Sequence, residues 1–202
     1  MSCIIIAEIG ENHLGDLHLA KQMIADAVKS GADIVKFQSY RGRDFKADDP
    51  EKEWFTKVEL SNEAHFELKK FADQSNIEFL SSPFSLERAK FLCEELGLRK
   101  IKIASGMMLN IKVLDYLNST NIDTIFLSTG MSTLHEIEEV LKHINNVPNI
   151  YLLHCTTQYP SKDEDANLKA ITTLQKEFNL PVGYSDHTLG IDACVSAVTL
   201  GA

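Results

Sequence analysis

The stretch Ile34-Val35-Lys36-Phe37-Gln38 decides the predicted fold, because an apolar run typical of a buried strand carries chemically capable side chains toward its carboxyl end. The same pattern occurs seven times, and a helical pattern follows each run. A βα repeat with reactive residues at the carboxyl ends of its strands is typical of a TIM (β/α)8 barrel. The sequence therefore predicts an α/β protein, a TIM (β/α)8 barrel truncated after the seventh βα unit. The seven runs are Ile4–Ile6 into Glu8, Ile34–Val35 into Lys36 and Gln38, Phe79–Leu80 into Ser81 and Ser82, Ile101–Ile103 around Lys102 into Ser105, Ile125–Leu127 into Ser128 and Thr129, Tyr151–Leu153 into His154 and Thr156, and Val182–Tyr184 into Ser185, Asp186 and His187.

Segments between the runs show the 3.6-residue spacing of amphipathic helices. A capping-box pattern, Thr133 with Glu136, indicates where one of these helices begins. An open flavodoxin-like sheet is the alternative architecture, but seven consecutive units exceed its usual count. We expect a single, incomplete domain over residues 1–202. The expected helices cover 17–30, 62 onward, 85–97, 111–118, 134 onward, 168–178 and 191 onward, with a short helix around 54 in the long connection 41–59.

Bulk composition excludes several classes of protein. The 202 residues carry a net charge of −9, and no stretch combines Lys and Arg with aromatics, so a nucleic-acid partner is not expected. The first residues lack the pattern of a signal peptide, and no apolar run is long enough to span a membrane. The four cysteines are widely spaced, which predicts free thiols in a reducing cytoplasm.

Lysines inside two of the strands are the first sign of chemistry. Lys36 and Lys102 occupy positions where burial of an unpaired ammonium is costly. Two inward lysines at one end of a barrel suit a phosphate or carboxylate ligand. The alternative is that each reaches the rim or pairs with Glu8, an acid that either transfers a proton or compensates Lys36.

Hydroxyl groups gather at the same strand ends. Each serine alone is more often a turn or cap residue, but four beside two lysines indicate a shell of hydrogen-bond donors for phosphate oxygens. No P-loop or G-x-G-x-x-G motif is present, so a nucleotide is not indicated. The four serines are Ser82, Ser105, Ser128 and Ser185.

The histidines give a weaker signal. His187 ends the seventh run, where a histidine is more often structural than a ligand, and Asp186 either orients it or caps the next helix. We expect His154 in the core and His13 at the mouth of the site. No pair has H-E-x-x-H spacing, so a complete metal site cannot be identified. The remaining histidines, expected as solvated helix residues, are His18, His65, His135 and His143.

These residues fall into seven ordered motifs that span the chain and resemble the sialic acid synthase family, whose members make N-acetylneuraminate and related nonulosonates. The motifs are Ala7-Glu8-Ile9-Gly10-Glu11-Asn12-His13, Val35-Lys36-Phe37-Gln38, Ser82-Pro83-Phe84-Ser85, Lys102-Ile103-Ala104-Ser105-Gly106, Leu127-Ser128-Thr129-Gly130-Met131, His154-Cys155-Thr156 through Tyr159-Pro160, and Ser185-Asp186-His187-Thr188.

The resemblance implies condensation of phosphoenolpyruvate with the open-chain aldehyde of an N-acetylated amino sugar, with loss of phosphate by C–O cleavage. It implies a divalent metal, Mn²⁺ or Mg²⁺, with His187 as one ligand, and a homo-oligomer, a dimer. It also implies a second metal histidine on an eighth strand and a C-terminal antifreeze-like domain, both beyond Ala202, and an acid where this chain has Met107. We therefore expect the chain as given to be poorly active. The implied roles are phosphoenolpyruvate binding for Lys36, Ser82, Lys102, Ser105, Ser128 and Ser185, and contact with the sugar or reacting centre for Glu8, Gln38 and Tyr159.

Two other hypotheses stay open. One is a Schiff-base pyruvate aldolase that uses Lys102 or Lys36 on the same barrel. The other is a fragment without catalytic activity that binds a phosphorylated ligand or assembles with other chains through open strand edges.

Overall fold

Seven parallel strands alternate with helices in residues 3–202, the part of the chain that the computed structural model describes. This alternation confirms the predicted α/β class. The chain divides into two compact units, one ending at Leu98 and the other covering Arg99–Ala202. No described helix combines the length and the apolar character that crossing a membrane requires.

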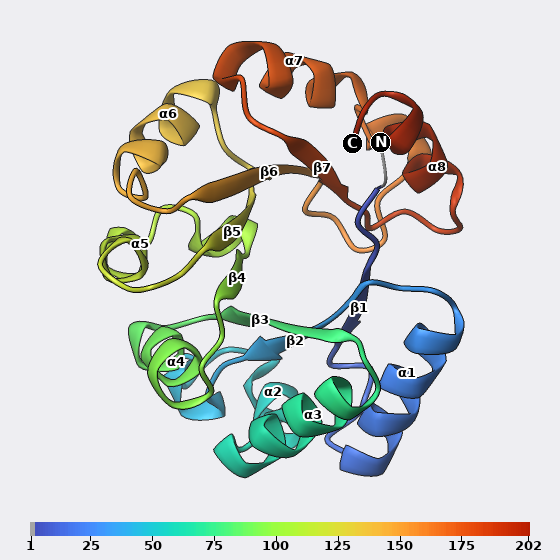
Figure 1. Cartoon of the computed structure of the whole chain (residues 1–202), viewed down its shortest axis with the longest axis vertical. Helices are drawn as coiled ribbons and strands as arrows, with labels where there is room; N and C mark the ends of the chain where they lie inside the picture. Colours follow the sequence, from blue (N-terminus) through green and yellow to red (C-terminus); the bar gives the residue numbers. More distant parts are fainter. Residues whose placement is uncertain (1–2) are drawn as a thin grey trace. The chain divides into compact units, whose positions relative to one another are not determined.

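The first unit is a three-stranded parallel sheet in the order β1-β2-β3. Its helices lie along one face of the sheet (Figure 1). The register places Glu8 opposite Lys36 and Gln38 opposite Ser82, so the predicted polar residues of neighbouring strands face one another. The elements are β1 (Ile6–Gly10), α1 (Leu17–Lys29), β2 (Ile34–Ser39), the 3-10 turn η1 (Gly42–Asp44), α2 (Lys52–Val58), α3 (Asn62–Gln74), β3 (Glu78–Pro83), α4 (Leu86–Lys90) and the π-helical turn η2 (Phe91–Glu95).

The second unit is a four-stranded parallel sheet in the order β4-β5-β6-β7, again with helices along one face (Figure 1). Register pairs Ser128 with Leu153 and Cys155 with Ser185. The elements are β4 (Lys100–Ile103), the 3-10 turn η3 (Ser105–Met107), α5 (Ile111–Asn118), β5 (Thr124–Ser128), α6 (Leu134–Lys142), β6 (Asn149–Cys155), the 3-10 turn η4 (Asp163–Asp165), α7 (Lys169–Phe178), β7 (Val182–Ser185) and α8 (Asp192–Thr199).

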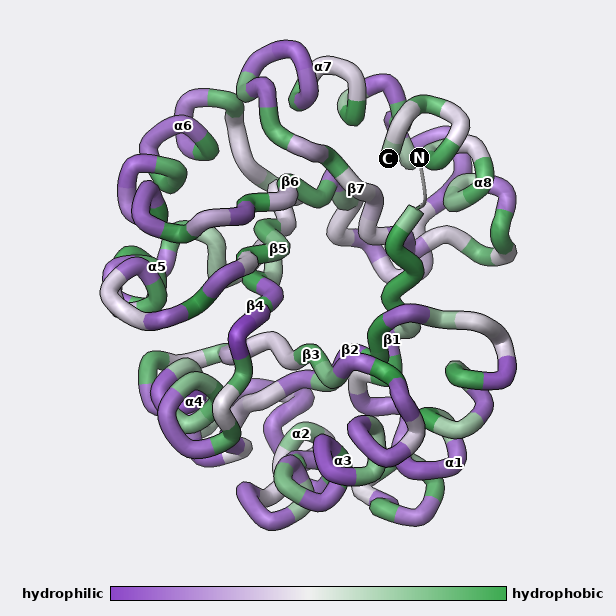
Figure 2. The backbone as a smooth tube through the Cα atoms, viewed as in Figure 1, coloured by the Kyte–Doolittle hydropathy of each residue, from purple (hydrophilic) through white to green (hydrophobic). Residues whose placement is uncertain are grey.

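Helix ends follow the local sequence signals. The Ser61 side chain accepts from the Ala64 amide at the start of α3, and Thr133 and Glu136 form the predicted capping box of α6. The short helix expected near Trp54 is α2. Figure 2 shows hydrophobic residues concentrated in β1 and β5, while the helices alternate between hydrophilic and hydrophobic turns. Apolar strand cores and one apolar stripe per helix therefore hold each unit together.

Two histidine predictions are wrong. His65 is fully buried rather than solvated, with its Nδ1 2.8 Å from the Ser61 carbonyl oxygen and its ring edge-on to Phe91. His13 does not lie at an open mouth, since it is 2% exposed and its Nδ1 accepts from the Gly15 amide at 3.0 Å. Both rings fill the core of the first unit and satisfy a local backbone group.

Candidate active site

Lys36 is the central residue of a polar group in the first unit. It lies in the middle of β2, its side chain is 7% exposed, and its ammonium forms an ion pair with Glu8 of β1. The same ammonium lies 3.3 Å from Ser82 Oγ on β3. Glu8 is half exposed, so the pair combines a buried cation with an accessible carboxylate. Three adjacent strands thus place one buried positive charge and one hydroxyl at a common point.

Gln38 lies two residues along β2 from Lys36 and therefore on the same face. Its Nε2 donates to Glu11 Oε2 at 3.2 Å. Burial, and secondarily the negative charge of Glu8, raises the pKa of the Glu11 carboxyl to about 7. The other oxygen, Glu11 Oε1, is buried without a hydrogen-bond partner among the described residues. The first unit therefore holds an acid that changes charge near neutral pH beside two predicted site residues.

Ser105 and Gly130 organise the corresponding group in the second unit. Ser105 Oγ, in η3, accepts from the Gly130 amide at 3.2 Å. Gly130 follows β5 and has no room for a side chain, since a Cβ there would lie 2.8 Å from Ser105 Oγ and 2.9 Å from the Cys155 carbonyl oxygen. Ser128 ends β5, and its hydroxyl is buried without a partner in the described part of the chain. The glycine allows the ends of β4, β5 and β6 to pack closely.

His187 is held by the chain that follows β6. Its Nδ1 lies 2.7 Å from the Thr156 carbonyl oxygen and 3.8 Å from Cys155 Sγ. Burial lowers the pKa of His187, but the hydrogen bonds with Cys155 and Thr156 outweigh it and leave the pKa above its usual value. A carbonyl partner requires a proton on Nδ1, so Nε2 of the neutral ring is available as an acceptor or a ligand.

The thiol of Cys155 responds to the same neighbours. Burial raises its pKa, yet hydrogen bonds from His187 and Ser105 outweigh burial and leave the pKa below its ordinary value. Lys102 adds a smaller effect of the same sign. Lys102 itself lies in β4, three residues before Ser105 in the sequence.

Tyr159 and Asp186 differ in their relation to His187: Tyr159 contacts its ring, whereas Asp186 bonds to other partners. Tyr159 is 76% exposed, with its ring 4.0 Å from the His187 ring between centroids. Asp186 accepts from the Thr188 amide at 2.8 Å and from Cys194 Sγ at 3.2 Å, so it closes a turn. The proposals that Asp186 orients His187 or caps α8 are therefore wrong. Ser185 ends β7 beside Cys155 of β6.

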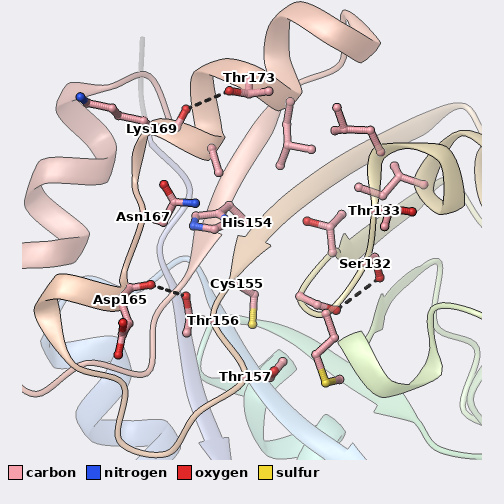
Figure 3. Close-up of a pocket in the computed structure, with 17 residues that line it drawn as sticks. Ser132, Thr133, His154, Cys155, Thr156, Thr157, Asp165, Asn167, Lys169 and Thr173 are labelled. Atoms are coloured by element: carbon pink, nitrogen blue, oxygen red, sulfur yellow. Dashed lines mark hydrogen bonds between the residues drawn. The ribbon is translucent and has the colours of Figure 1, made fainter.

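A cavity of about 630 Å³ opens beside this group in the second unit (Figure 3). Cys155 and Thr156 border it, whereas the predicted site residues of the second unit do not. The predicted core histidine, His154, is confirmed at its wall, where its Nε2 lies 2.8 Å from the Ala166 carbonyl oxygen. Figure 3 also shows Thr156 bonded to the Asp165 carbonyl, which ties the cavity to the loop after β6. The cavity adjoins the predicted residues but is not built from them.

Among the predicted site residues near β6 and β7, the one that could serve as a metal ligand is His187, through Nε2. Of the described residues, those that gather three potential metal ligands are His135, Glu138 and Glu139, exposed neighbours on α6. This cluster is an ordinary helix surface, as expected for the solvated His135. Within the described residues, no group of three potential ligands includes His187.

Sequence reasoning missed Glu11 and Cys155 as contributors to these groups, and it named Thr156 at a strand end without a role. All three lie inside quoted motifs, so proximity to the strand ends was the available signal. Thr156 acts through its carbonyl oxygen, a contribution that no residue type encodes. Glu11 and Cys155 matter because of partners 27 and 32 residues away in the sequence.

Comparison with known proteins finds a matching family and similar sequences. The profile of the NeuB family matches residues 23–202. N,N'-diacetyllegionaminic acid synthase of Campylobacter jejuni is 46% identical over 98% of this chain and 65% of its own length. N-acetylneuraminate-9-phosphate synthase of Homo sapiens is 36% identical over 99% of this chain and 60% of its own length. The chain thus spans less than two thirds of these relatives.

A solved structure of a related protein has a similar fold. The N-acetylneuraminic acid (sialic acid) synthetase of Leptospira borgpetersenii, crystallised with citrate, superposes with a TM-score of 0.94 and 36% identity over 100% of this chain and 71% of that chain. This similarity confirms the TIM-barrel-type fold class predicted from the βα repeat. On the match of its sequence, its fold and its ordered strand-end motifs, the chain belongs to the NeuB family.

Proposed function

We propose that this chain is the phosphoenolpyruvate-binding barrel part of a nonulosonic acid synthase. The substrates are phosphoenolpyruvate and the open-chain aldehyde of an N-acetylated amino sugar of the N-acetylmannosamine type. The observation that carries the proposal is Lys36, a buried ammonium on a central strand that lies against Ser82 and an accessible Glu8. Such a group attracts a small anion with several oxygens.

The reaction follows from the electronic structure of an enol phosphate. C3 of phosphoenolpyruvate forms a bond to the aldehyde carbon, and the aldehyde oxygen takes up a proton. Water adds at C2. The bond between C2 and the bridging oxygen then breaks, and inorganic phosphate leaves with that oxygen. Atoms balance as phosphoenolpyruvate plus aldehyde plus water giving nonulosonic acid plus phosphate.

The remaining residues take roles that their positions support. We assign Glu8, Gln38 and Tyr159 to the sugar or the reacting centre. His187 is the residue that would hold a divalent metal, Mn²⁺ or Mg²⁺, which when bound polarises a carbonyl oxygen as a Lewis acid. The other residues assigned to phosphoenolpyruvate, besides Lys36 and Ser82, are Lys102, Ser105, Ser128 and Ser185.

The proposed setting is a homodimer in the cytoplasm, with no membrane or nucleic-acid partner. No disulfide joins the four cysteines in the described part of the chain, which suits a reducing compartment. The homodimer rests on the family resemblance, and light scattering at several protein concentrations tests it.

The decisive experiment follows the bridging oxygen. The chain is incubated with N-acetylmannosamine, Mn²⁺ and phosphoenolpyruvate labelled with ¹⁸O at the C2–O–P position, and the released phosphate is analysed by mass spectrometry. The proposal expects labelled phosphate that requires the sugar. Unlabelled phosphate, or release without sugar, contradicts it. A borohydride-trapped pyruvate adduct on Lys36 or Lys102 supports the aldolase instead.

A binding experiment tests the role of Lys36 even when turnover is slow. Lys36→Met keeps the length of the side chain and removes its charge, and a hydrogen bond to a charged group contributes about 1.5–3 kcal/mol. Phosphoenolpyruvate should therefore bind about 10- to 150-fold more weakly. The control is Lys29→Met, since Lys29 is an exposed lysine of α1. Equal affinity of both variants, measured by calorimetry, would remove Lys36 from the site.

A further inference from the structure

The side chain of Glu11 has a place in the first unit that the proposed roles do not use. Glu11 follows β1, where Gly10 adopts a left-handed conformation with φ of +52° and the strand register shifts between Glu8 and Gly10. This turn leads the chain back so that Glu11 Oε2 meets Gln38 Nε2 at 3.2 Å. A Cβ at Gly10 would lie 3.6 Å from the same Gln38 nitrogen, so backbone and carboxylate approach the amide together.

An amide side chain offers two different faces. Gln38 presents a donor on Nε2 and an acceptor on Oε1, and a contact with a carboxylate oxygen selects Nε2 because a carboxylate only accepts. The amide oxygen is then turned away from Glu11. The group that it can recognise is a donor, such as the hydroxyl or acetamido N–H of an amino sugar.

We propose that Glu11 is a positioning residue that fixes the amide of Gln38, so that Gln38 Oε1 accepts a hydrogen bond from a donor group of the sugar substrate. The recognition half of this inference rests on the proposed function, whereas the orientation of the amide does not. Glu11 acts through Gln38 and touches no reacting atom.

The charge of Glu11 makes this positioning depend on pH. Burial, and then the Glu8 carboxylate, raises the pKa of Glu11 to about 7, while its own backbone amide and Lys36 act in the opposite direction. Tyr40, which directly follows β2, also interacts electrostatically with Glu11, and burial lowers the pKa of His13, two residues after Glu11. Protonated Glu11 is able to donate to Gln38 Oε1, so the amide loses its single orientation below the pKa.

The first test reads the amide directly, without any substrate. The side-chain amide resonances of Gln38, labelled with ¹⁵N, are followed by NMR as pH changes. The wild type should titrate with a midpoint near the Glu11 value of about 7. Glu11→Gln should abolish this titration, whereas the control Glu53→Gln, an exposed acid of α2, should leave it intact. A Gln38 amide that ignores both pH and Glu11→Gln overturns the proposal, however active the enzyme is.

The second test separates recognition of the sugar from general damage. Loss of one oriented hydrogen bond should raise the KM for N-acetylmannosamine about tenfold in Glu11→Ala, with the KM for phosphoenolpyruvate changed less than about twofold. The KM for the sugar should also fall in the wild type, and not in Glu11→Gln, as pH rises from about 6 to about 8. Equal effects on both substrates overturn the recognition half. If turnover is too slow for kinetics, as expected for a poorly active chain, the Kd for N-acetylmannosamine in the presence of phosphoenolpyruvate replaces the KM, and equal sugar affinity of Glu11→Ala and wild type overturns the recognition half.

Discussion

Substitution of Gly130 by alanine should destabilise the second unit for a reason that can be read from three distances. The new Cβ would lie 2.7 Å from Thr157 Cγ2, 2.8 Å from Ser105 Oγ and 2.9 Å from the Cys155 carbonyl oxygen. Side chains can move away, but the Cys155 carbonyl belongs to the end of β6. Overpacking of this kind costs about 1–3 kcal/mol, and the Gly130 amide bond to Ser105 adds about 1 kcal/mol.

The expected loss is therefore about 2–4 kcal/mol, or a fall in Tm of roughly 4–16 °C for a chain of this size. Thermal unfolding followed by circular dichroism measures it. Gly106→Ala is the matched control, since a Cβ there meets nothing within 4 Å and should change stability by less than about 0.5 kcal/mol. Adding Ser105→Ala should restore part of the loss, because it removes one of the three obstructing atoms. If Gly130→Ala and Gly106→Ala have the same Tm, the close packing at this strand end is refuted.

Three further substitutions test single features. Ser128→Ala removes a buried hydroxyl without a partner in the described chain, so urea unfolding should show no loss and a gain of up to about 1 kcal/mol; a clear loss would reveal a partner. Arg88→Ala removes hydrogen bonds to Ser39 at 2.8 Å and Asn62 at 2.7 Å and should lower stability by about 3–5 kcal/mol; a loss below about 1 kcal/mol contradicts a role in packing the first unit. His65 has its pKa lowered to about 4, mainly by burial, so its contribution to stability is lost as pH falls from about 6.5 to about 4, and His65→Gln should remove that loss in urea titrations.

Patterns that depend on neighbours in sequence were predictable, and contacts between distant segments were not. The caps at Ser61 and Thr133 follow from side chains within three residues of the amides that they bind. The position of Lys36 follows from alternation along one strand. The bond between Glu11 and Gln38 depends instead on a left-handed turn at Gly10, which no local spacing announces.

The burial of histidines likewise depends on contacts between distant segments. His65 has helical spacing, which fits a solvated or a buried face equally well. Only the packing of α3 against Phe91 decides that the ring is enclosed. A polar aromatic side chain is therefore poorly placed by periodicity, since its polarity and its ring argue for opposite environments.

The first unit buries two titratable groups whose effects on stability have opposite signs. Burial favours the neutral form of each, so the pKa of Glu11 rises to about 7 and that of His65 falls to about 4. Between about pH 4.5 and 6.5 the native state binds more protons at Glu11 than the unfolded chain does, and fewer at His65. The Glu11 contribution is lost as pH rises through about 7, whereas the His65 contribution is lost as pH falls toward about 4. The two slopes therefore oppose each other in the wild type, and each single variant should expose the other: stability rises with pH in Glu11→Gln and falls with pH in His65→Gln. Parallel slopes in the two variants would show that burial does not hold both groups neutral.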